Sequence, residues 1–536
     1  MYQLGAVPAG LSWDEAAIGY NGSAIWKARR DEWLVRLPVS FKSFGDYKAP
    51  LAIYINGVFT GILGMTPWAV RLPFALAGIF SILFMSGVLY ELFRMIPHSI
   101  RIPDFQKMSL TKTIVIFGVF IMATSVWNIH FSRAGFESGM ALSFVCFMAW
   151  MWLLGQRFII EKKQKLTLLT IIFVGIAGSL AMYTYHSAKI AVPLLFGVFL
   201  LTSSIQWKQR WKLFGASLLV LLIVSHPLLQ DTFFAKGAER FHQTSLFSQS
   251  TGIGIPFVIT RNLLAHFSLD FLLNGQTTTL RHGDGKWGVL FFSEWLLLIT
   301  SGVSMVFLMR RSRRTQQIKE ITRVFLFALG WIVSGMLPAT IGVEIPHANR
   351  ALLAYPGFLI LMCLGLFFLF KLWYFFLHNK SLFVQGRKFA SESSLLILKA
   401  VLGLTLLTHC LLFLSYWQNY FLNYSAFSAD AFQNGYQQVF EYVIPEEEKV
   451  EKILFSDTYG QPYIYALFFR QTNPIWYQGG SLIKYEFTNK ISTADLQRNN
   501  TLIVATPDQI DPTLGDRIIQ APDGSVRFVI IKTPVR

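Results

Sequence analysis

The residues best suited to chemistry in this sequence are carboxylates, cations and aromatic groups in short polar stretches between apolar runs. A carboxylate can take a proton from a hydroxyl group, and a lysine or arginine can stabilise the charge of a departing phosphate. Charged side chains close to long apolar runs are costly and usually mark function or a specific pairing. The candidates are Asp14, Glu15, Asp46, Tyr47, Lys48, Arg133, Glu137, Tyr185, His186, Lys189, Arg281, His282, His347 and Arg350.

Two of the carboxylates, Asp14 and Glu15, are adjacent in the sequence WDEA. Adjacent side chains on a helix point about 100° apart, so these two cannot act as a simple pair on one atom. One is expected to do chemistry while the other orients a neighbour or forms a salt bridge. The alternative is that a carboxylate here only caps the helix predicted for residues 14–28.

Three of the charged residues have ordinary structural explanations as well as functional ones. Lys48 stands just before a predicted surface helix at residues 51–63, where a lysine commonly reaches for lipid headgroups. Arg133 and Glu137 are four residues apart, so they could simply pair along one helix face. Both interpretations stay open for each residue.

Cations also stand at the ends of later apolar runs. Lys189 follows Tyr185 and His186 in YTYHSAK, where a lone lysine is usually an anchor, yet the aromatic and polar neighbours also suit a binding surface. Arg350 lies in the short loop PHANR, and arginine binds phosphate by paired hydrogen bonds. Both interpretations stay open for Lys189, whereas a functional role is favoured for Arg350.

A metal site is the alternative for the histidines. His282 and His347 together with a carboxylate would supply ligands for a divalent ion. No HExxH or similar spacing supports this, and the chain has no phosphate-binding glycine loop. The sequence therefore gives no firm indication of a cofactor.

Long apolar runs position these residues. The chain has 536 residues, of which 53% are hydrophobic and 14% charged, so a bilayer is the expected solvent. Runs of about 20 apolar residues match the roughly 30 Å hydrocarbon thickness. Ten such runs lie near residues 74–94, 112–129, 138–160, 166–185, 189–205, 213–230, 288–309, 323–343, 351–377 and 395–417.

The net charge of +17 is distributed in a way that indicates membrane topology and argues against nucleic acid binding. Within the membrane body, most lysines and arginines fall in five alternate loops, at residues 94–112, 157–165, 208–212, 310–323 and 371–399. The intervening short loops contain few. By the positive-inside rule the basic loops face the cytoplasm, and the candidate residues face outward from the cell membrane.

The same topology divides the chain into three parts. Residues 1–73 form an outer segment with surface helices, residues 74–417 a membrane body with an outer loop at about 231–287, and residues 418–536 an outer tail. Stretches such as TLIVAT and VRFVIIK predict a small α/β domain in the tail. Ten spans would place both termini outside, so we expect a transmembrane helix before Met1 in the native gene.

The motifs WDEA, GDYKAPL, RLP, SRAGFE, YTYHSAK and PHANR occur in this order. Together they resemble the GT-C superfamily of glycosyltransferases that use lipid-phosphate sugars, in the bacterial branch of protein O-mannosyltransferases and aminoarabinose transferases. The resemblance covers about residues 8–360 and is strongest in the first 75. It implies a helical membrane fold of GT-C type and a catalytic acid in the first outer loop, which again points to a preceding helix.

The resemblance also implies roles for single residues. Asp14 of the DE pair looks like the catalytic base, and Lys48, Lys189 and Arg350 would hold the phosphate of the carrier. Glu137 stands where several relatives have a nearby aspartate, so the pattern gives it no definite role.

The function that fits these observations is transfer of a sugar from polyprenyl phosphate, such as undecaprenyl phosphate, to an acceptor hydroxyl. The acceptor could be a protein, a glycan or a lipid. A transporter or flippase for lipids or lipid-linked sugars is the alternative, but such proteins tend to have repeated halves with polar groups near the midplane. A third interpretation is an assembly protein that the membrane body anchors. One-sided polar residues and ten spans favour the enzyme.

Overall fold

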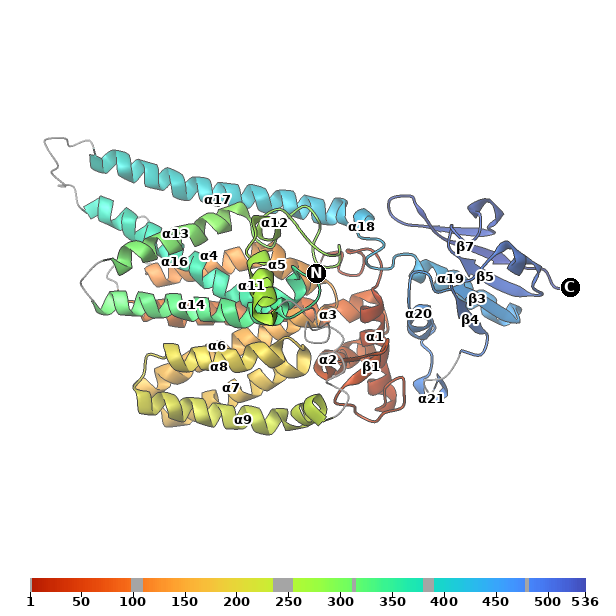
Figure 1. The fold of residues 1–536 in the computed structure, drawn as a ribbon, viewed down its shortest axis with the longest axis horizontal. Coiled ribbons are helices and arrows are strands. Elements are labelled where there is room, and N and C mark those ends of the chain that lie inside the picture. The colour runs from red at the N-terminus through yellow and green to blue at the C-terminus, as the bar shows by residue number, and fades with distance from the viewer. Residues whose placement is uncertain (1, 98–108, 235–253, 311–314, 379–389, 478–481) are drawn as a thin grey trace.

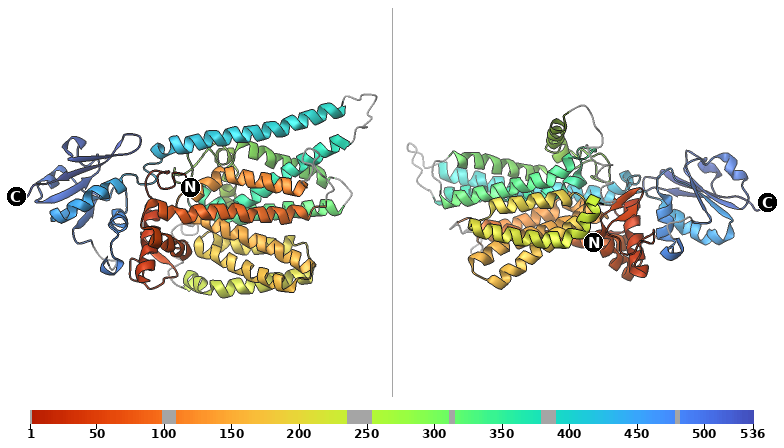
Figure 2. Two further views of the ribbon diagram at one scale, coloured as in Figure 1. Left: turned by 180° about the vertical axis from the view of Figure 1, so that it is seen from behind. Right: turned by 60° about the horizontal axis from the view of Figure 1, so that its bottom comes forward.

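The computed structural model describes residues 2–97, 109–234, 254–310, 315–378, 390–477 and 482–536. Long helices form a bundle, and a compact N-terminal segment lies at one end of it (Figure 1). A C-terminal domain, residues 436–536, lies beyond that segment. Two turned views show the same order along the long axis (Figure 2).

Within the described ranges, eight helices are long and apolar enough to cross a membrane. They lie in α3 (Pro67–Arg94), α6 (Glu137–Ile160), α7 (Gln164–Thr184), α9 (Trp207–Phe234), α13 (Phe292–Met309), α14 (Gln316–Thr340), α16 (Tyr355–His378) and α17 (Ala390–Leu422). The pair α4 (Leu110–Thr124) and α5 (Val126–Arg133), bent by 51°, makes a ninth if it is one span. The one remaining apolar run, at residues 189–205, falls on α8 (Ala188–Thr202), a helix of 15 residues. The prediction of a helical multi-pass membrane protein is confirmed.

Capping residues explain where the helices depart from the apolar runs. Helix α3 begins seven residues before the run at 74–94, because Pro67 suits the first turn and the Thr66 side chain accepts a hydrogen bond from the Ala69 amide. The run at 112–129 contains a break, because Ser125 is extended and accepts a hydrogen bond from the Asn128 amide. That bond starts α5 in a new direction.

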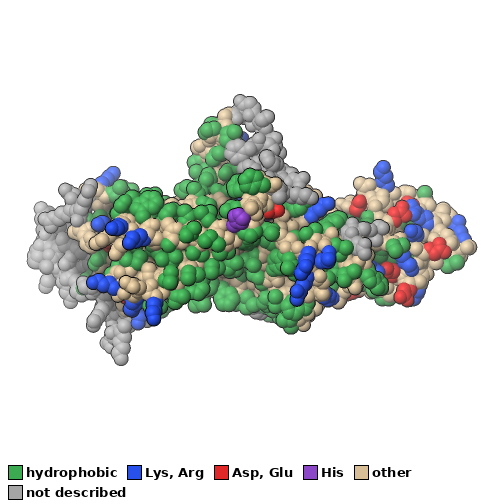
Figure 3. Space-filling view, turned by 90° about the horizontal axis from the view of Figure 1, so that it is seen from below, with side chains coloured by type: hydrophobic (Ala, Val, Ile, Leu, Met, Phe, Trp, Pro, Cys, Tyr) green, Lys and Arg blue, Asp and Glu red, His purple; other side chains and the backbone are tan. Residues whose placement is uncertain are grey.

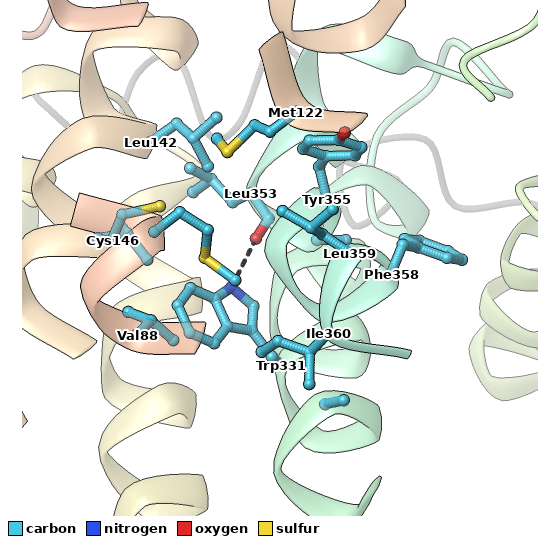
Figure 4. Packing of buried hydrophobic residues seen from close by; sticks show 14 of the residues in the cluster. Val88, Met122, Leu142, Cys146, Trp331, Leu353, Tyr355, Phe358, Leu359 and Ile360 are labelled. Carbon is cyan, nitrogen blue, oxygen red and sulfur yellow. Dashed lines mark hydrogen bonds between the residues drawn. The ribbon is translucent and has the colours of Figure 1, made fainter. Parts of the chain in front are cut away.

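Apolar side chains dominate both the surface and the interior of the bundle. Hydrophobic side chains cover its middle, and lysines and arginines lie towards both ends of the molecule, mixed with acidic side chains on the C-terminal domain (Figure 3). Exposed residues such as Ile223, Phe307 and Leu404 suit contact with lipid tails. Inside, the Trp331 indole donates a hydrogen bond of 2.9 Å to the Leu353 carbonyl within a tightly packed apolar cluster (Figure 4).

The N-terminal segment contains both helices expected there. Helix α1 (Trp13–Ala28) and helix α2 (Pro50–Leu63) flank a hairpin of β1 (Phe41–Ser43) and β2 (Asp46–Lys48). Gly22 and Gly57 let α1 and α2 cross closely, because an added Cβ at Gly57 would lie 2.5 Å from the Gly22 carbonyl oxygen. The hairpin and the crossing fix β2 beside the start of α1.

The C-terminal domain is the predicted α/β unit. Its five-stranded sheet has the order β4-β3-β5-β7-β6, in which β3 is parallel to both neighbours and β7 antiparallel to both. The strands are β3 (Lys452–Ser456), β4 (Tyr485–Thr488), β5 (Thr501–Ala505), β6 (Arg517–Gln520) and β7 (Val526–Lys532). Helices α19 (Tyr436–Glu446) and α20 (Pro462–Phe469) share one apolar core with the sheet and with Ala16 and Tyr20 of α1. The domain is therefore packed directly onto the N-terminal segment.

The predicted outer loop at 231–287 contains regular structure. Residues 231–234 belong to α9, and α11 (Ile255–Ala265) and α12 (Leu269–Leu272) follow, while residues 235–253 lie outside the described residues. The Asp284 carboxylate then accepts hydrogen bonds from the Lys286 and Trp287 amides and from the Asn419 side chain of α17. These bonds hold the loop that carries Arg281 against the bundle.

Candidate active site

A cavity of about 420 Å³ lies where the N-terminal segment meets the bundle. Its walls come from the start of α1, the turn between α5 and α6, the loop before α13, the segment between α14 and α16, and the linker before α19. Nine of the predicted site residues line it: Asp14, Glu15, Lys48, Glu137, Tyr185, Arg281, His282, His347 and Arg350.

Asp14 lies between two cations in this cavity. Its Oδ1 accepts a hydrogen bond from Lys48 Nζ, and its Oδ2 accepts one of 2.5 Å from Arg281 Nη2. Burial alone would raise the pKa of Asp14, but the two cations overcome that effect and hold its pKa below the ordinary value. Asp14 is therefore a carboxylate at neutral pH, and its side chain remains 27% exposed.

The two cations are held by different means. Lys48 is the last residue of β2, where it pairs with Phe41, and its side chain is only 6% exposed. Its ammonium group is buried against Asp14 instead of exposed at the start of α2, which contradicts the interpretation of Lys48 as an exposed anchor. The Arg281 carbonyl accepts a hydrogen bond of 2.8 Å from the His130 ring, and its guanidinium lies over the Trp13 ring.

Glu15 points away from Asp14 into a buried ion pair with Arg71 of α3. The distance from Arg71 Nε to Glu15 Oε1 is 2.7 Å, and both side chains are almost fully buried. The Gly135 and Ser12 amides also donate to this carboxylate. Burial would raise the pKa of Glu15, but Arg71 and the amide donors together lower it. Because Glu15 is almost fully buried whereas Asp14 is partly exposed in the cavity, Glu15 is suited to position the site rather than to accept a proton.

Two neighbouring histidines form another part of the wall. The His282 and His347 rings are 4.4 Å apart, and His347 Nε2 lies 3.4 Å from Glu344 Oε2. Burial lowers the pKa of His282 well below its ordinary value, and the neighbouring His347 and Arg281 lower it further. His282 is therefore neutral at pH 7. Among the residues that the structure describes, no three His, Cys, Asp or Glu side chains come close enough together to hold a metal ion.

Arg350 completes the positive side of the cavity. It lies in the short helix α15 (Ala348–Ala351), which the His347 ring caps by accepting a hydrogen bond from the Arg350 amide. The guanidinium packs against Gly342, where an added Cβ would collide with it. Lys48, Arg281 and Arg350 thus present three cations to one small space.

Five predicted residues do not line this cavity: Asp46, Tyr47, Arg133, His186 and Lys189. Lys189 Nζ donates a 3.0 Å hydrogen bond to Thr232 of α9. The His186 ring donates to the Tyr47 carbonyl, and both Tyr47 and Asp46 belong to β2. The His186–Tyr47 hydrogen bond connects β2 to the segment between α7 and α8, and the Lys189–Thr232 bond connects α8 to α9.

Arg133 and Glu137 do not lie on one helix. Arg133 ends α5 and Glu137 begins α6, so the expected pairing along a helix face is wrong. Arg133 donates to the Tyr2 and Val7 carbonyls instead, and it lies over the Phe421 ring. It therefore fastens the N-terminal residues to α17.

A scan against protein-family models and a search of curated proteins found no match. A search of solved structures did find similar folds. One is the crystal structure of ArnT from Cupriavidus metallidurans bound to undecaprenyl phosphate, with a TM-score of 0.53 and 12% identity, over 98% of this chain and 94% of that one. The chain has the GT-C fold.

Two further structures were found with lower similarity. The GT-C chain aligns with ArnT in its apo state at a TM-score of 0.49 and 12% identity, over 98% of this chain and 94% of that one. It aligns with the oligosaccharyltransferase AglB from Archaeoglobus fulgidus, in complex with an inhibitory peptide and a dolichol-phosphate, at 0.46 and 11% identity, over 98% and 70%.

Several residues of the GT-C chain enter the cavity without having been predicted. Glu344 precedes the PHANR motif, Asn349 lies within it, and Gln433 comes from the linker before α19. The Gln433 side-chain oxygen accepts hydrogen bonds from the Trp13 amide and the Tyr465 hydroxyl. No pattern in the sequence distinguishes Gln433, because its partners are more than 400 and about 30 residues away.

Replacing Arg71 by methionine should destabilise the GT-C chain by about 3–5 kcal/mol, because Glu15 would remain buried without its partner. The measurement is chemical unfolding of purified protein in mixed micelles. Glu486→Gln is the control, because it breaks an exposed ion pair with Arg498 and should cost about 1 kcal/mol or less. Equal costs for the two variants would contradict a central role for the buried pair.

Proposed function

We propose that this GT-C chain is a glycosyltransferase that moves a sugar from a polyprenyl phosphate carrier to an acceptor hydroxyl, with Asp14 as the base. The observation that carries this proposal is that one partly exposed carboxylate, Asp14, lies among three cations in a single cavity. Such a site offers one group to remove a proton and several to hold a phosphate.

The chemistry needs no more than these groups. The acceptor oxygen attacks the anomeric carbon, and the bond from that carbon to the carrier phosphate breaks. The acceptor proton passes to the Asp14 carboxylate, and the carrier leaves as a phosphate anion that Lys48, Arg281 and Arg350 stabilise. One displacement inverts the configuration of the anomeric carbon.

Because Asp14 is paired with Lys48 and Arg281, binding of the donor also changes how basic Asp14 is in this mechanism. Without a donor, Lys48 and Arg281 both neutralise Asp14 and make it a weak base. A donor phosphate competes for the same two cations. As their charge is shared with phosphate, Asp14 becomes more basic, so the base strengthens only when a sugar is in place.

The membrane setting of the reaction is part of the proposal. The cavity is lined by Glu137 at the start of α6, whereas Arg157 lies in the last turn of that helix, next to the basic loop at 157–165; this supports an outward-facing site in the cell membrane. The ArnT structure that shares the fold was determined with undecaprenyl phosphate. An undecaprenyl carrier is therefore the first donor to try, with protein, glycan and lipid acceptors. We propose no obligatory metal or nucleotide.

Replacing Asp14 by asparagine should abolish sugar transfer without weakening donor binding, because the amide keeps the size of the side chain but cannot take a proton and no longer competes as a charge for Lys48 and Arg281. The measurement is release of polyprenyl phosphate from a panel of polyprenyl phosphate sugars, by purified protein supplied with membrane extract as acceptor. The sugar that supports release identifies the donor.

Two results of this assay would count against the proposal. If Asp14→Asn loses both donor affinity and sugar transfer, Asp14 has a structural role. No release from any donor by well-folded wild-type protein would favour transport of a lipid-linked sugar.

Replacing Arg350 by alanine should weaken undecaprenyl phosphate binding by about 1.5–3 kcal/mol, because a charged hydrogen bond to phosphate would be lost. Tryptophan fluorescence during titration with the lipid measures the affinity. Lys286→Ala removes the same charge from an exposed position outside the cavity and should change little. Unchanged affinity in both Arg350→Ala and Lys48→Ala would remove the phosphate site.

Lys189 provides a further arm of this experiment. A loss of affinity in Lys189→Ala would extend the phosphate site towards α9, where Lys189 bonds Thr232. An unchanged affinity would confine the site to the cavity and contradict the role that the sequence resemblance implies for Lys189.

The pH dependence should differ between the free enzyme and its donor complex. The lowered pKa of Asp14 keeps it ionised, so kcat/KM should show no loss from Asp14 as pH falls from 7 to 5. In the complex the cations are shared, so the pKa of Asp14 rises and kcat should fall at a higher pH than kcat/KM. Asp14→Glu should change the pH at which kcat falls. Coincident profiles would contradict competition for the cations.

A further inference from the structure

A second cavity, of about 370 Å³, lies between the N-terminal segment and the C-terminal domain. One wall is formed by residues 5–11 and another by residues 433–438, where the linker enters α19. Tyr465 and Phe469 of α20 and Pro522 close the remaining sides. The volume falls within the range of about 300–1,000 Å³ typical of small-molecule sites.

The lining of this cavity contains no charged side chain among the residues that the structure describes. It consists of glycines, apolar residues, tyrosines and the amides Gln433, Asn434, Gln437 and Gln438. The neighbouring catalytic cavity, in contrast, contains three cations and several carboxylates. The two cavities therefore suit different ligands, and an ionised group has no counter-charge here.

Unused hydrogen-bonding groups on the wall formed by residues 433–438 indicate which groups a ligand must offer. Asn434 is only 6% exposed, and its Oδ1 has no hydrogen-bond partner within the described ranges. A buried acceptor of this kind calls for a donor. The first turn of α19 begins at Gly435 without a side-chain cap, so amides of residues lining the cavity are available as donors. A group that both donates and accepts, such as a hydroxyl, satisfies both.

The cavity shares a wall with the catalytic cavity. Gln433 lines both, and its side-chain oxygen accepts hydrogen bonds from the Trp13 amide and the Tyr465 hydroxyl. Trp13 directly precedes Asp14 at the start of α1. A ligand held in the second cavity is therefore next to the proposed base, separated from it by one side chain.

From this arrangement we infer that the second cavity binds an uncharged sugar unit of the acceptor, so that the acceptor is a neutral glycan; this inference rests on the proposed function. Sugar hydroxyls donate and accept hydrogen bonds, as Asn434 and the α19 amides require. Tyr436 and Tyr465, whose rings stack on each other with centroids 4.0 Å apart, form part of the wall beside them.

A peptide acceptor fits these walls less well. Extended peptides are usually bound along a sheet edge or in an elongated groove. This cavity is instead bounded by four separate segments and touches the sheet only at Pro522, in the turn between β6 and β7. A compact unit matches its shape better than an extended chain.

The test is binding of neutral trisaccharides of glucose, mannose and N-acetylglucosamine to the full chain, in lipid nanodiscs or a detergent without sugar headgroups. Saturation-transfer NMR and calorimetry on the wild type should find one that binds. Asn434→Leu and Gln437→Ala should weaken it at least ten-fold; Gln437 is exposed, so its variant tests the site even if Asn434→Leu does not fold. Gln471→Ala, an exposed amide of the same domain outside the cavity, should change nothing.

Other outcomes overturn the inference. Absence of trisaccharide binding, or binding that both cavity variants leave unchanged, excludes the cavity as a sugar site. Binding of a threonine-containing peptide that depends on Asn434 and Gln437 assigns the cavity to a peptide acceptor instead, and displacement of the trisaccharide by inorganic phosphate shows an anion site.

Donor release separates this inference from the proposed function. Release that depends on Asp14 but not on any trisaccharide overturns the glycan acceptor alone. Trisaccharide binding without any release that depends on Asp14 overturns the glycosyltransferase and, with it, the acceptor role of the cavity.

Discussion

The buried ion pair of Glu15 and Arg71 is the interaction on which the rest of the site depends. Arg71 reaches from the start of a membrane helix and donates hydrogen bonds to the carbonyls of Leu4, Pro8 and Gly10 as well as to Glu15. Glu15 in turn holds the Gly135 amide and closes the capping box at Ser12. Such pairs add little net stability, but breaking one is costly, so they specify a single arrangement.

That arrangement determines what the neighbouring residue can do. Because Glu15 is fixed towards Arg71, the helix turns Asp14 by about 100° into the cavity. There Asp14 meets Lys48 from the hairpin and Arg281 from a loop more than 250 residues away. Charges attract more strongly in a partly buried site than in water, so Lys48 and Arg281 keep the Asp14 carboxylate ionised and in place.

Local patterns in the sequence predicted the elements better than their partners. The ten apolar runs, the helix at 14–28 and the α/β tail follow from periodicity and length, which are properties of short segments. Lys48 was expected at a helix start, yet it ends a strand, because the hairpin depends on pairing with Phe41. Gln433 was not found at all, since its place depends on packing between segments distant in sequence.

The C-terminal domain is fixed beside the site because its apolar core is continuous with that of α1. Ala16 and Tyr20 pack with residues of α20, and an added Cβ at Gly19 would lie 2.6 Å from the Phe468 ring. A domain fixed this closely cannot swing away without exposing that core to water. The wall at Gln433 therefore keeps a constant position relative to Asp14, so a ligand bound on the domain side is oriented towards the base by the fold itself.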